Sequence, residues 1–389
     1  MSTSLLIHDS AAAGHTNWAC AQLAAGRAQG VIIDPFHTPL TSRPRHCDAA
    51  QVVDRVREHR PGVEILLDPS THAALLQGTN LRANYDTWSL WPDGFANLAN
   101  PLALRSHVEA VLAVQHSLGI APTAPTRVLD HPTGAAADCA LALADEARRQ
   151  QPDVRQALVG RRSFWAAGHA LDDYLGRLVT LRAPQWHVTV LRDNPDFPPD
   201  LTDRYSTAGL ARSVHSLARR ASVSLGHGAD VAALPALAAG ADGLGTGWYS
   251  KQRVCSPSLF QTGGGGLNRR WCPHPGLLAR LRGDVAEALD DRDADFAREM
   301  RGQRDLPSNE AERRDQHLDA VAALVAHLDA AGANAAARVP AARRLLQTAD
   351  DAWNRAIALG LNDLGRPEQT RWITELRAGF ELYARGEEL

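Results

Sequence analysis

Lysine is almost absent from this chain of 389 residues: Lys251 is the only one, although lysine and arginine together number 41. Guanidinium groups therefore carry nearly all of the positive charge, and any lysine chemistry must use Lys251. The formal net charge is −3 at pH 7. This balance argues against a strongly cationic surface of the kind that binds nucleic-acid phosphates. Nucleic acid stays a possible partner, without support from the charge.

Cysteine is scarce as well, and the five cysteines are scattered and odd in number. This usage is typical of reduced thiols and argues against a disulfide framework. The first residues lack the basic segment and apolar core of a secretory signal. No run approaches the roughly 18 apolar residues that cross a membrane as a helix. We therefore expect a cytoplasmic protein with no membrane partner.

Short apolar runs recur before residue 250, and each is continuous instead of alternating with polar residues. Strands covered on both faces have this pattern, as in parallel sheets flanked by helices. Eight such β/α units match the size of a (βα)8 TIM barrel, and a doubly wound open sheet is the alternative. The expected strands are residues 4–7, 31–33, 64–67, 127–129, 157–159, 187–191, 222–225 and 243–245, and the expected helices are 17–25, 48–60, 102–118, 135–149, 171–181, 208–219 and 231–239.

The pattern becomes helical from about residue 275, and no strand is expected beyond that point. Helices are expected at residues 277–289, 309–331, 341–360 and 367–385. We therefore divide the chain into a TIM-barrel catalytic domain (1–260), a glycine-rich linker or lid (261–274) and an all-helical domain (275–389). The helical domain would pack on the barrel, on a protein partner or on a second copy of the chain.

A carboxylate directly follows each of the first four expected strands, as Asp9, Asp34, Asp68 and Asp130. The active site of a TIM barrel lies at the carboxyl ends of its strands. There the carboxylates could transfer protons, bind sugar hydroxyls, stabilise an oxocarbenium-like centre or hold a divalent cation. Asp130 and His131 form the best candidate pair for proton transfer. Turn and cap chemistry is the competing explanation for each aspartate.

The last two expected strands end in glycines, as Gly226-His227-Gly228 and Gly245-Thr246-Gly247. A strand that stops on glycines before a helix offers backbone N–H groups and a helix N-terminus to an anion. Guanidinium groups also suit phosphate oxygens. We therefore predict a site for a phosphate-bearing small molecule. Its candidate ligands are Gly226, His227, Gly228, Gly245, Thr246, Gly247, Arg161 and Arg192.

Metal ligation receives little support from the sequence. Cys255, Cys272 and His274 flank the glycine-rich segment, but without the paired spacing of a structural zinc site. No metal ligand is therefore assigned. The cofactor remains open, with FMN and a divalent cation both possible.

Residues 222–248 resemble the phosphate-binding half of (βα)8 barrels. The same glycine ends resemble FMN-dependent barrel oxidoreductases, which would imply that FMN phosphate binds there. Residues 114–119 and 128–130, with Gly240-Ala241-Asp242, are similar to segments of tRNA-guanine transglycosylase-like barrels. The chain departs from that family in having Gly245-Thr246-Gly247 in place of an aspartate on the last strand, and in lacking a cysteine-rich zinc site.

The sequence therefore predicts a TIM-barrel enzyme that acts on a phosphate-bearing nucleotide or sugar. Its chemistry would be carboxylate-assisted at or near a glycosidic carbon, as in transglycosylases or glycosyl hydrolases. Two alternatives remain. One is an FMN-dependent oxidoreductase, and the other is a non-catalytic barrel that senses a phosphorylated metabolite.

Overall fold

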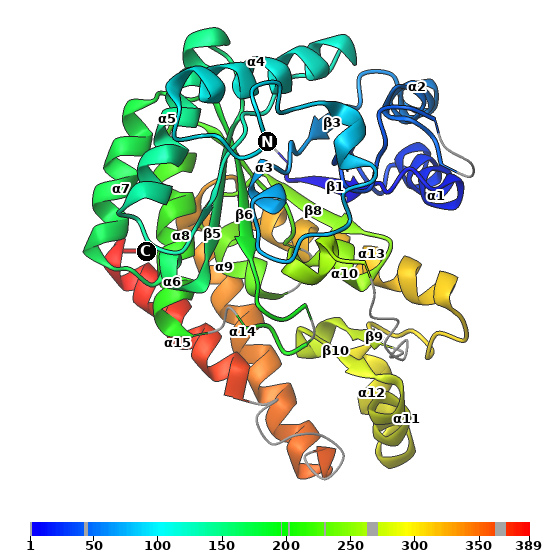
Figure 1. Ribbon diagram of the computed structural model, residues 1–389. Helices are drawn as coiled ribbons and strands as arrows, with labels where there is room; N and C mark the ends of the chain where they lie inside the picture. Colours follow the sequence, from blue (N-terminus) through cyan, green and yellow to red (C-terminus); the bar gives the residue numbers. More distant parts are fainter. Residues whose placement is uncertain are drawn as a thin grey trace.

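The computed structural model contains one sheet of eight parallel strands with helices around it (Figure 1). It describes residues 2–42, 46–195, 197–200, 203–228, 231–262, 271–361 and 371–389. The strands are β1 (Ser4–His8), β2 (Gly30–Ile33), β3 (Glu64–Leu67), β4 (Val128–Leu129), β5 (Gln156–Arg161), β6 (Gln185–Leu191), β7 (Ser222–Leu225) and β8 (Gly243–Gly247). All eight expected strands are confirmed.

The order of the strands identifies the architecture. They are hydrogen-bonded in the order β3-β2-β1-β8-β7-β6-β5-β4. Leu6 of β1 is in register with Gly30 of β2 on one side and with Gly245 of β8 on the other. Pairing of the first strand with the last curls the sheet into a barrel and excludes the doubly wound alternative. β3 and β4 stand at the two ends of the order, so the curled sheet is open between them.

Three of the helices between the strands, α2, α4 and α8, begin where a side chain accepts hydrogen bonds from their first N–H groups. Asp48 and Gln51 form a capping box at the start of α2, and Asn100 caps α4 with Pro101 in its first turn. The helices of this part of the chain are α1 (Ala13–Ala24), α2 (Ala49–His59), α3 (Thr71–Ala74), α4 (Pro101–Ser117), α5 (Ala135–Gln150), α6 (Arg162–Trp165), α7 (His169–Thr180), α8 (Arg204–Ala218), α9 (Leu234–Ala238) and α10 (Ser250–Arg253), with 3₁₀ turns η1 (Tyr85–Trp88), η2 (Val231–Ala233) and η3 (Pro257–Phe260).

Side-chain alternation decides what faces the barrel interior. Leu6, Ile32 and Leu66 form a small buried cluster that joins β1, β2 and β3. Side chains two residues apart point to the same face of a strand. The next inward positions are therefore His8, Asp34 and Asp68, at the carboxyl ends of these strands. The apolar cluster thus lies directly beneath the polar side chains at the mouth of the barrel.

A β-hairpin precedes the C-terminal helices and corrects the sequence expectation. Strands β9 (Trp271–His274) and β10 (Ala279–Arg282) pair antiparallel where a helix over residues 277–289 was expected. The helix instead begins at Gly283, as α11 (Gly283–Arg292). Leu278, inside the expected helix, adopts a positive φ of 48° that breaks helical geometry.

The remaining elements are helical, as the sequence predicts: α12 (Ala294–Met300), α13 (Glu310–Ala331), α14 (Ala335–Ala358) and α15 (Arg371–Gly386). Residues 263–270 of the expected linker and 367–370 of the last expected helix lie outside the described residues. Figure 1 shows α14 and α15 running along the side of the barrel that carries α8 and α9. One buried apolar cluster includes side chains from both parts, such as Leu244 of β8 and Phe380 of α15. None of the described helices is both long and apolar enough to cross a membrane.

Arg338 of α14 ties the C-terminal helices to the barrel. Its side chain is only 2% exposed. It donates hydrogen bonds to the carbonyl oxygens of Leu237 and Ala241, at 3.2 and 2.9 Å, and to the Thr3 hydroxyl at 3.1 Å. It also pairs with Asp329, which in turn accepts from the Thr3 backbone N–H. One guanidinium therefore joins α13, α14, α9 and the chain just before β1.

Replacing Arg338 should reveal how strongly this contact holds the fold. Arg338→Met removes the cationic partner of the Asp329 carboxylate and a donor to the Ala241 carbonyl, so it should lower the free energy of unfolding by about 3 kcal/mol. Urea denaturation followed by circular dichroism measures the loss. Arg344→Met, at an exposed position on the same helix, is the control and should change stability by less than about 0.5 kcal/mol. Equal effects of the two substitutions would contradict the role given to Arg338.

Candidate functional site

The aspartates that follow β1, β2 and β3 are buried, and each is bonded to its own loop. In every case one carboxylate oxygen accepts the backbone N–H two residues further on, which is the turn chemistry that aspartate favours. The oxygen-to-nitrogen distances are 2.6 Å for Asp9 and Ala11, 2.9 Å for Asp34 and Phe36, and 2.8 Å for Asp68 and Ser70. These carboxylates therefore shape the mouth of the barrel, whatever else they do.

Asp34 also holds His37, whose Nδ1 lies 2.9 Å from a carboxylate oxygen. Burial alone would raise the pKa of Asp34, but the charge and hydrogen bond of His37 bring that pKa below its usual value. Burial likewise opposes the charged form of His37, yet Asp34 raises the pKa of this imidazole. The Leu259 carbonyl forms a further hydrogen bond with His37. Through His37, this pair connects η3, which contains Leu259, to the loop that follows β2.

Imidazoles from β1, β6 and the β7 end meet in the barrel, where His8 and His187 are buried and His227 is partly exposed. His8 Nε2 donates to the Gly226 carbonyl at 2.6 Å, and the rings of His8 and His227 stack with their centroids 3.9 Å apart. His187 Nδ1 lies 3.1 Å from the Ser224 hydroxyl. His187 Nε2 and His227 Nδ1 are buried and have no hydrogen-bond partner. Buried polar atoms are normally satisfied, so these two nitrogens mark a candidate ligand site.

The protonation states of this cluster follow from its burial. Burial, followed by the charges of neighbouring groups, holds the pKa values of His187 and His227 well below the usual value. Burial also lowers the pKa of His8, against the Gly226 carbonyl and the carboxylates of Asp34 and Asp68. At neutral pH, His187 and His227 are therefore neutral imidazoles, each with one N–H and one nitrogen lone pair.

The glycines at the ends of β7 and β8 make room for these rings. A Cβ on Gly226 would lie 2.8 Å from His187 Nε2 and would collide with the Thr189 hydroxyl. A Cβ on Gly245 would collide with the Gly226 carbonyl oxygen and lie 3.0 Å from His8 Nε2. The close approach of strands and imidazoles therefore requires glycine at both positions.

Two backbone N–H groups of the glycines predicted to bind phosphate already form hydrogen bonds with neighbouring strands. The N–H of Gly226 donates to the Val188 carbonyl at 2.8 Å, and that of Gly228 donates to the Gly245 carbonyl at 3.2 Å. The helix that follows, α9, has only five residues. Phosphate binding at these glycines stays a prediction. A bound phosphate would have to share these two N–H groups with the carbonyl groups that already accept from them.

Thr246 and Gly247 of β8 contact different elements of the structure. The Thr246 hydroxyl lies 3.1 Å from His317 Nε2 of α13, so this side chain points outward to the C-terminal helices. Gly247 is packed closely against Gln252 of α10. The segment Gly245-Thr246-Gly247 therefore does not face one ligand site as a unit, because Gly245 faces the barrel interior and the Thr246 side chain faces the C-terminal helices.

Both arginines that were predicted to bind phosphate form ion pairs with carboxylates. Arg161 contacts Asp130 at 3.0 Å and Asp193 at 2.9 Å, and Arg192 forms an ion pair with Asp200. The Asp130 side chain is 73% exposed. Its neighbour His131 is also exposed, and its Nδ1 bonds the Thr133 hydroxyl at 2.9 Å. Asp130 and His131 thus sit on the rim and bond to different partners, apart from the buried imidazoles.

The sequence interpretation missed His72, His187 and Ser224. His187 and Ser224 lie within strands that were treated as uniformly apolar, although His187 and Thr189 alternate with valines on β6. Period-two alternation was the available signal for an inward polar face. Across the described residues, no group of three His, Cys, Asp or Glu side chains is arranged to hold a metal ion.

No protein family and no curated protein matches the sequence. Among solved structures, the chain is similar to the crystal structure of a probable tagatose 6 phosphate kinase from Sinorhizobium meliloti 1021. The sequence identity is 14%, the TM-score is 0.34, and 98% of each chain is covered. A likeness this distant says nothing about the reaction.

Gly245→Ala tests the packing of the mouth. The new methyl group would collide with backbone, so this substitution should lower the free energy of unfolding by at least about 3 kcal/mol. Gly176→Ala is the matched control, because Gly176 lies within α7 with no atom near its would-be Cβ. The control should stabilise the protein by about 0.5–1 kcal/mol. Similar unfolding midpoints for the two variants would show that Gly245 is not tightly packed.

Asp9 should make stability depend on pH. Burial raises its pKa to about 6, and one of its carboxylate oxygens has no partner. Because the folded state binds this proton more tightly than the unfolded state, the stabilising contribution is full below about pH 4 and is lost as the pH rises through 6. Asp9→Asn should therefore gain stability relative to the wild type between pH 4 and 7, by up to about 3 kcal/mol. Urea titrations at several pH values measure the difference, and a difference independent of pH would contradict this assignment.

Proposed function

We propose that the chain is a barrel enzyme that acts on a phosphate-bearing sugar or nucleotide, with histidine-based acid–base chemistry at or near a glycosidic carbon. The observation that carries the proposal is the pair of buried, unpartnered imidazole nitrogens on His187 and His227. His227 follows the carboxyl end of β7, where barrel enzymes have their active sites. His187 lies deeper in the barrel, in register with Ser224 of β7.

His227 is the candidate general base. His227 is a partly exposed residue, whereas His8 and His187 are buried. A neutral imidazole can take a proton from a water molecule or a sugar hydroxyl. Burial makes it a weak base in the free protein, but an anionic phosphate nearby would raise its pKa toward neutrality. Substrate binding would thus activate the base.

The carboxylates supply the complementary charge. Asp34 and Asp68 both raise the pKa of His8 through their charges, so their field reaches the centre of the cluster. The same field would stabilise positive charge that develops at a glycosidic carbon. Arg161 at the rim is the candidate phosphate ligand, because a guanidinium binds phosphate oxygens in a bidentate manner. A bound phosphate would compete with Asp130 and Asp193 for Arg161.

A panel of sugar phosphates and nucleotides, each with its dephosphorylated counterpart, tests this proposal. At least one phosphorylated compound should raise the melting temperature and be turned over, as measured by ³¹P NMR and chromatography. His227→Asn should lower kcat by about 10²- to 10⁴-fold and keep the ligand-induced melting shift. His59→Asn, in the last turn of α2, is the control and should keep full activity.

Three results would contradict the proposal. One is equal turnover by wild type and His227→Asn, and another is a panel in which phosphorylated compounds neither bind nor react. The third is flavin absorption in the visible spectrum of the purified protein, which would favour the FMN oxidoreductase alternative.

A further inference from the structure

An apolar cavity lies outside the barrel, between its β7–β8 end and the C-terminal elements. Its volume is about 270 Å³. The walls come from segments far apart in the sequence, because barrel, hairpin and helices each contribute one side. The apolar lining includes Phe197, Val231, Leu244, Leu278, Val321, Leu324 and Leu345.

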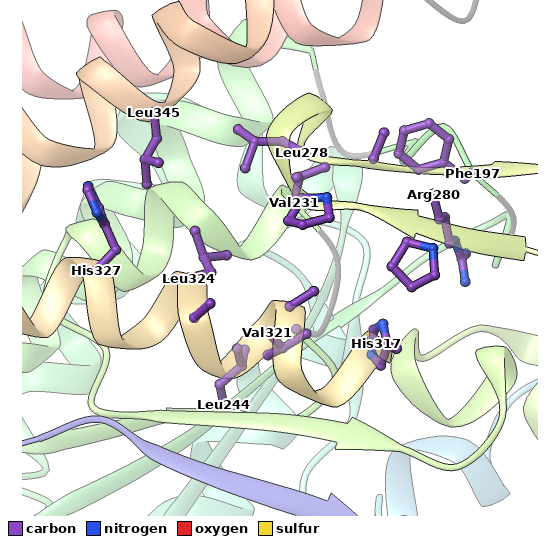
Figure 2. Close-up of a pocket in the computed structure, with 16 residues that line it drawn as sticks. Phe197, Val231, Leu244, Leu278, Arg280, His317, Val321, Leu324, His327 and Leu345 are labelled. Atoms are coloured by element: carbon purple, nitrogen blue, oxygen red, sulfur yellow. The ribbon is translucent and has the colours of Figure 1, made fainter. Parts of the chain in front are cut away.

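Polar side chains are confined to the ends of this cavity. Figure 2 shows His327 at one end and Arg280 with His317 at the other, with apolar side chains between them. His327 is exposed, so the cavity opens to solvent at its end. Arg280 is partly exposed, so a polar group beside it keeps some contact with water. The cavity thus has the plan of a small-molecule site, with an apolar body and few polar groups.

Positive charge gathers at the Arg280 end. Arg253 is buried, and its guanidinium donates to the carbonyl oxygens of Gly247 and Trp248 at 2.9 and 3.1 Å. Burial, followed by the charge of Arg280, lowers the pKa of Arg253 to about 9, which still leaves it charged at neutral pH. After burial, the charges of Arg253 and Arg280 are what lower the pKa of His317. Two guanidinium groups therefore act on one point of the cavity wall.

Among the described residues, the acidic side chain that acts on Arg253 is Glu310, and it is already engaged. The charge of Glu310 raises the pKa of Arg253, against burial. Glu310 also forms an ion pair with Arg313 at 2.7 Å. Its negative charge is therefore shared between two guanidinium groups. Arg280 donates a hydrogen bond to the Pro195 carbonyl at 2.9 Å, a neutral acceptor that leaves the guanidinium charge in place. An anionic group on a ligand would be attracted there.

We propose that this cavity binds an apolar carboxylic acid, with its hydrocarbon part between α13 and β8 and its carboxylate beside Arg280. An apolar cavity of about 150 Å³ accommodates benzene, so this one suits a ligand of roughly ten non-hydrogen atoms. Linear or aromatic acids of that size fit the apolar walls and the charged end together.

This site is separate from the proposed acid–base centre. Leu244 lines the cavity from β8, whereas the neighbouring Gly245 faces the imidazoles inside the barrel. The two sites therefore lie on opposite faces of the same strand. Binding in the cavity can be measured without any substrate turnover, so the proposal does not depend on the proposed function.

Isothermal titration calorimetry with octanoate and its neutral analogue octanol tests the site. Octanoate should bind the wild type saturably at one site per chain, about tenfold more tightly than octanol. Ala320→Phe fills the cavity from α13 and should weaken octanoate binding at least about tenfold. Ala326→Phe places the same side chain on an exposed part of α13 outside the lining and should leave binding unchanged.

Arg280→Gln tests the charged end. It should weaken octanoate about tenfold and leave octanol unchanged, with circular dichroism showing that the variant is folded. The absence of saturable octanoate binding, or equal binding by Ala320→Phe and Ala326→Phe, would overturn the site. Equal affinity of the wild type for octanoate and octanol would overturn the acidic ligand.

Discussion

The ladder between β1 and β8 is the contact on which the rest of the structure depends. It brings the first and last strands together and sets the ends of all eight strands around one mouth. The Gly226 carbonyl, at the end of the neighbouring β7, leaves no space for a side chain at Gly245, and His8 Nε2 of β1 approaches the same point. The fold therefore places a buried imidazole beside a closely packed strand pair.

Burial and charge act in opposite directions at this mouth. Water is largely excluded from His8, His187 and Asp68, and the low dielectric favours neutral imidazoles. Carboxylates nearby favour the charged form, and Asp34 succeeds with His37 because the two are in direct contact. His187 and His227 lack such a partner and remain neutral. Two kinds of histidine therefore coexist in one small volume, and only the neutral kind has nitrogens left for a ligand.

The strands could be predicted because parallel strands buried on both faces are continuous apolar runs, and all eight were found where expected. The positions of Asp9, Asp34 and Asp68 at strand ends also followed from the sequence. Their bonds to their own loops did not, because aspartate before a turn is compatible with both turn and site chemistry. His187 was missed because its strand was treated as uniformly apolar, although His187 and Thr189 alternate with valines. The cavity could not be predicted, since Leu244, Leu278 and Leu345 line it from elements joined only by tertiary packing.

The bonds between Thr3 and Asp329 have a consequence for the order of folding. The backbone N–H and hydroxyl of Thr3 donate to a carboxylate 326 positions further along the chain. β1 also pairs with β8, which is more than 200 residues away. A ribosome releases the first strand long before either partner has been synthesised. The N-terminal segment therefore lacks two of its native partners during much of synthesis. Its contacts are complete only after β8 and the C-terminal helices have been made.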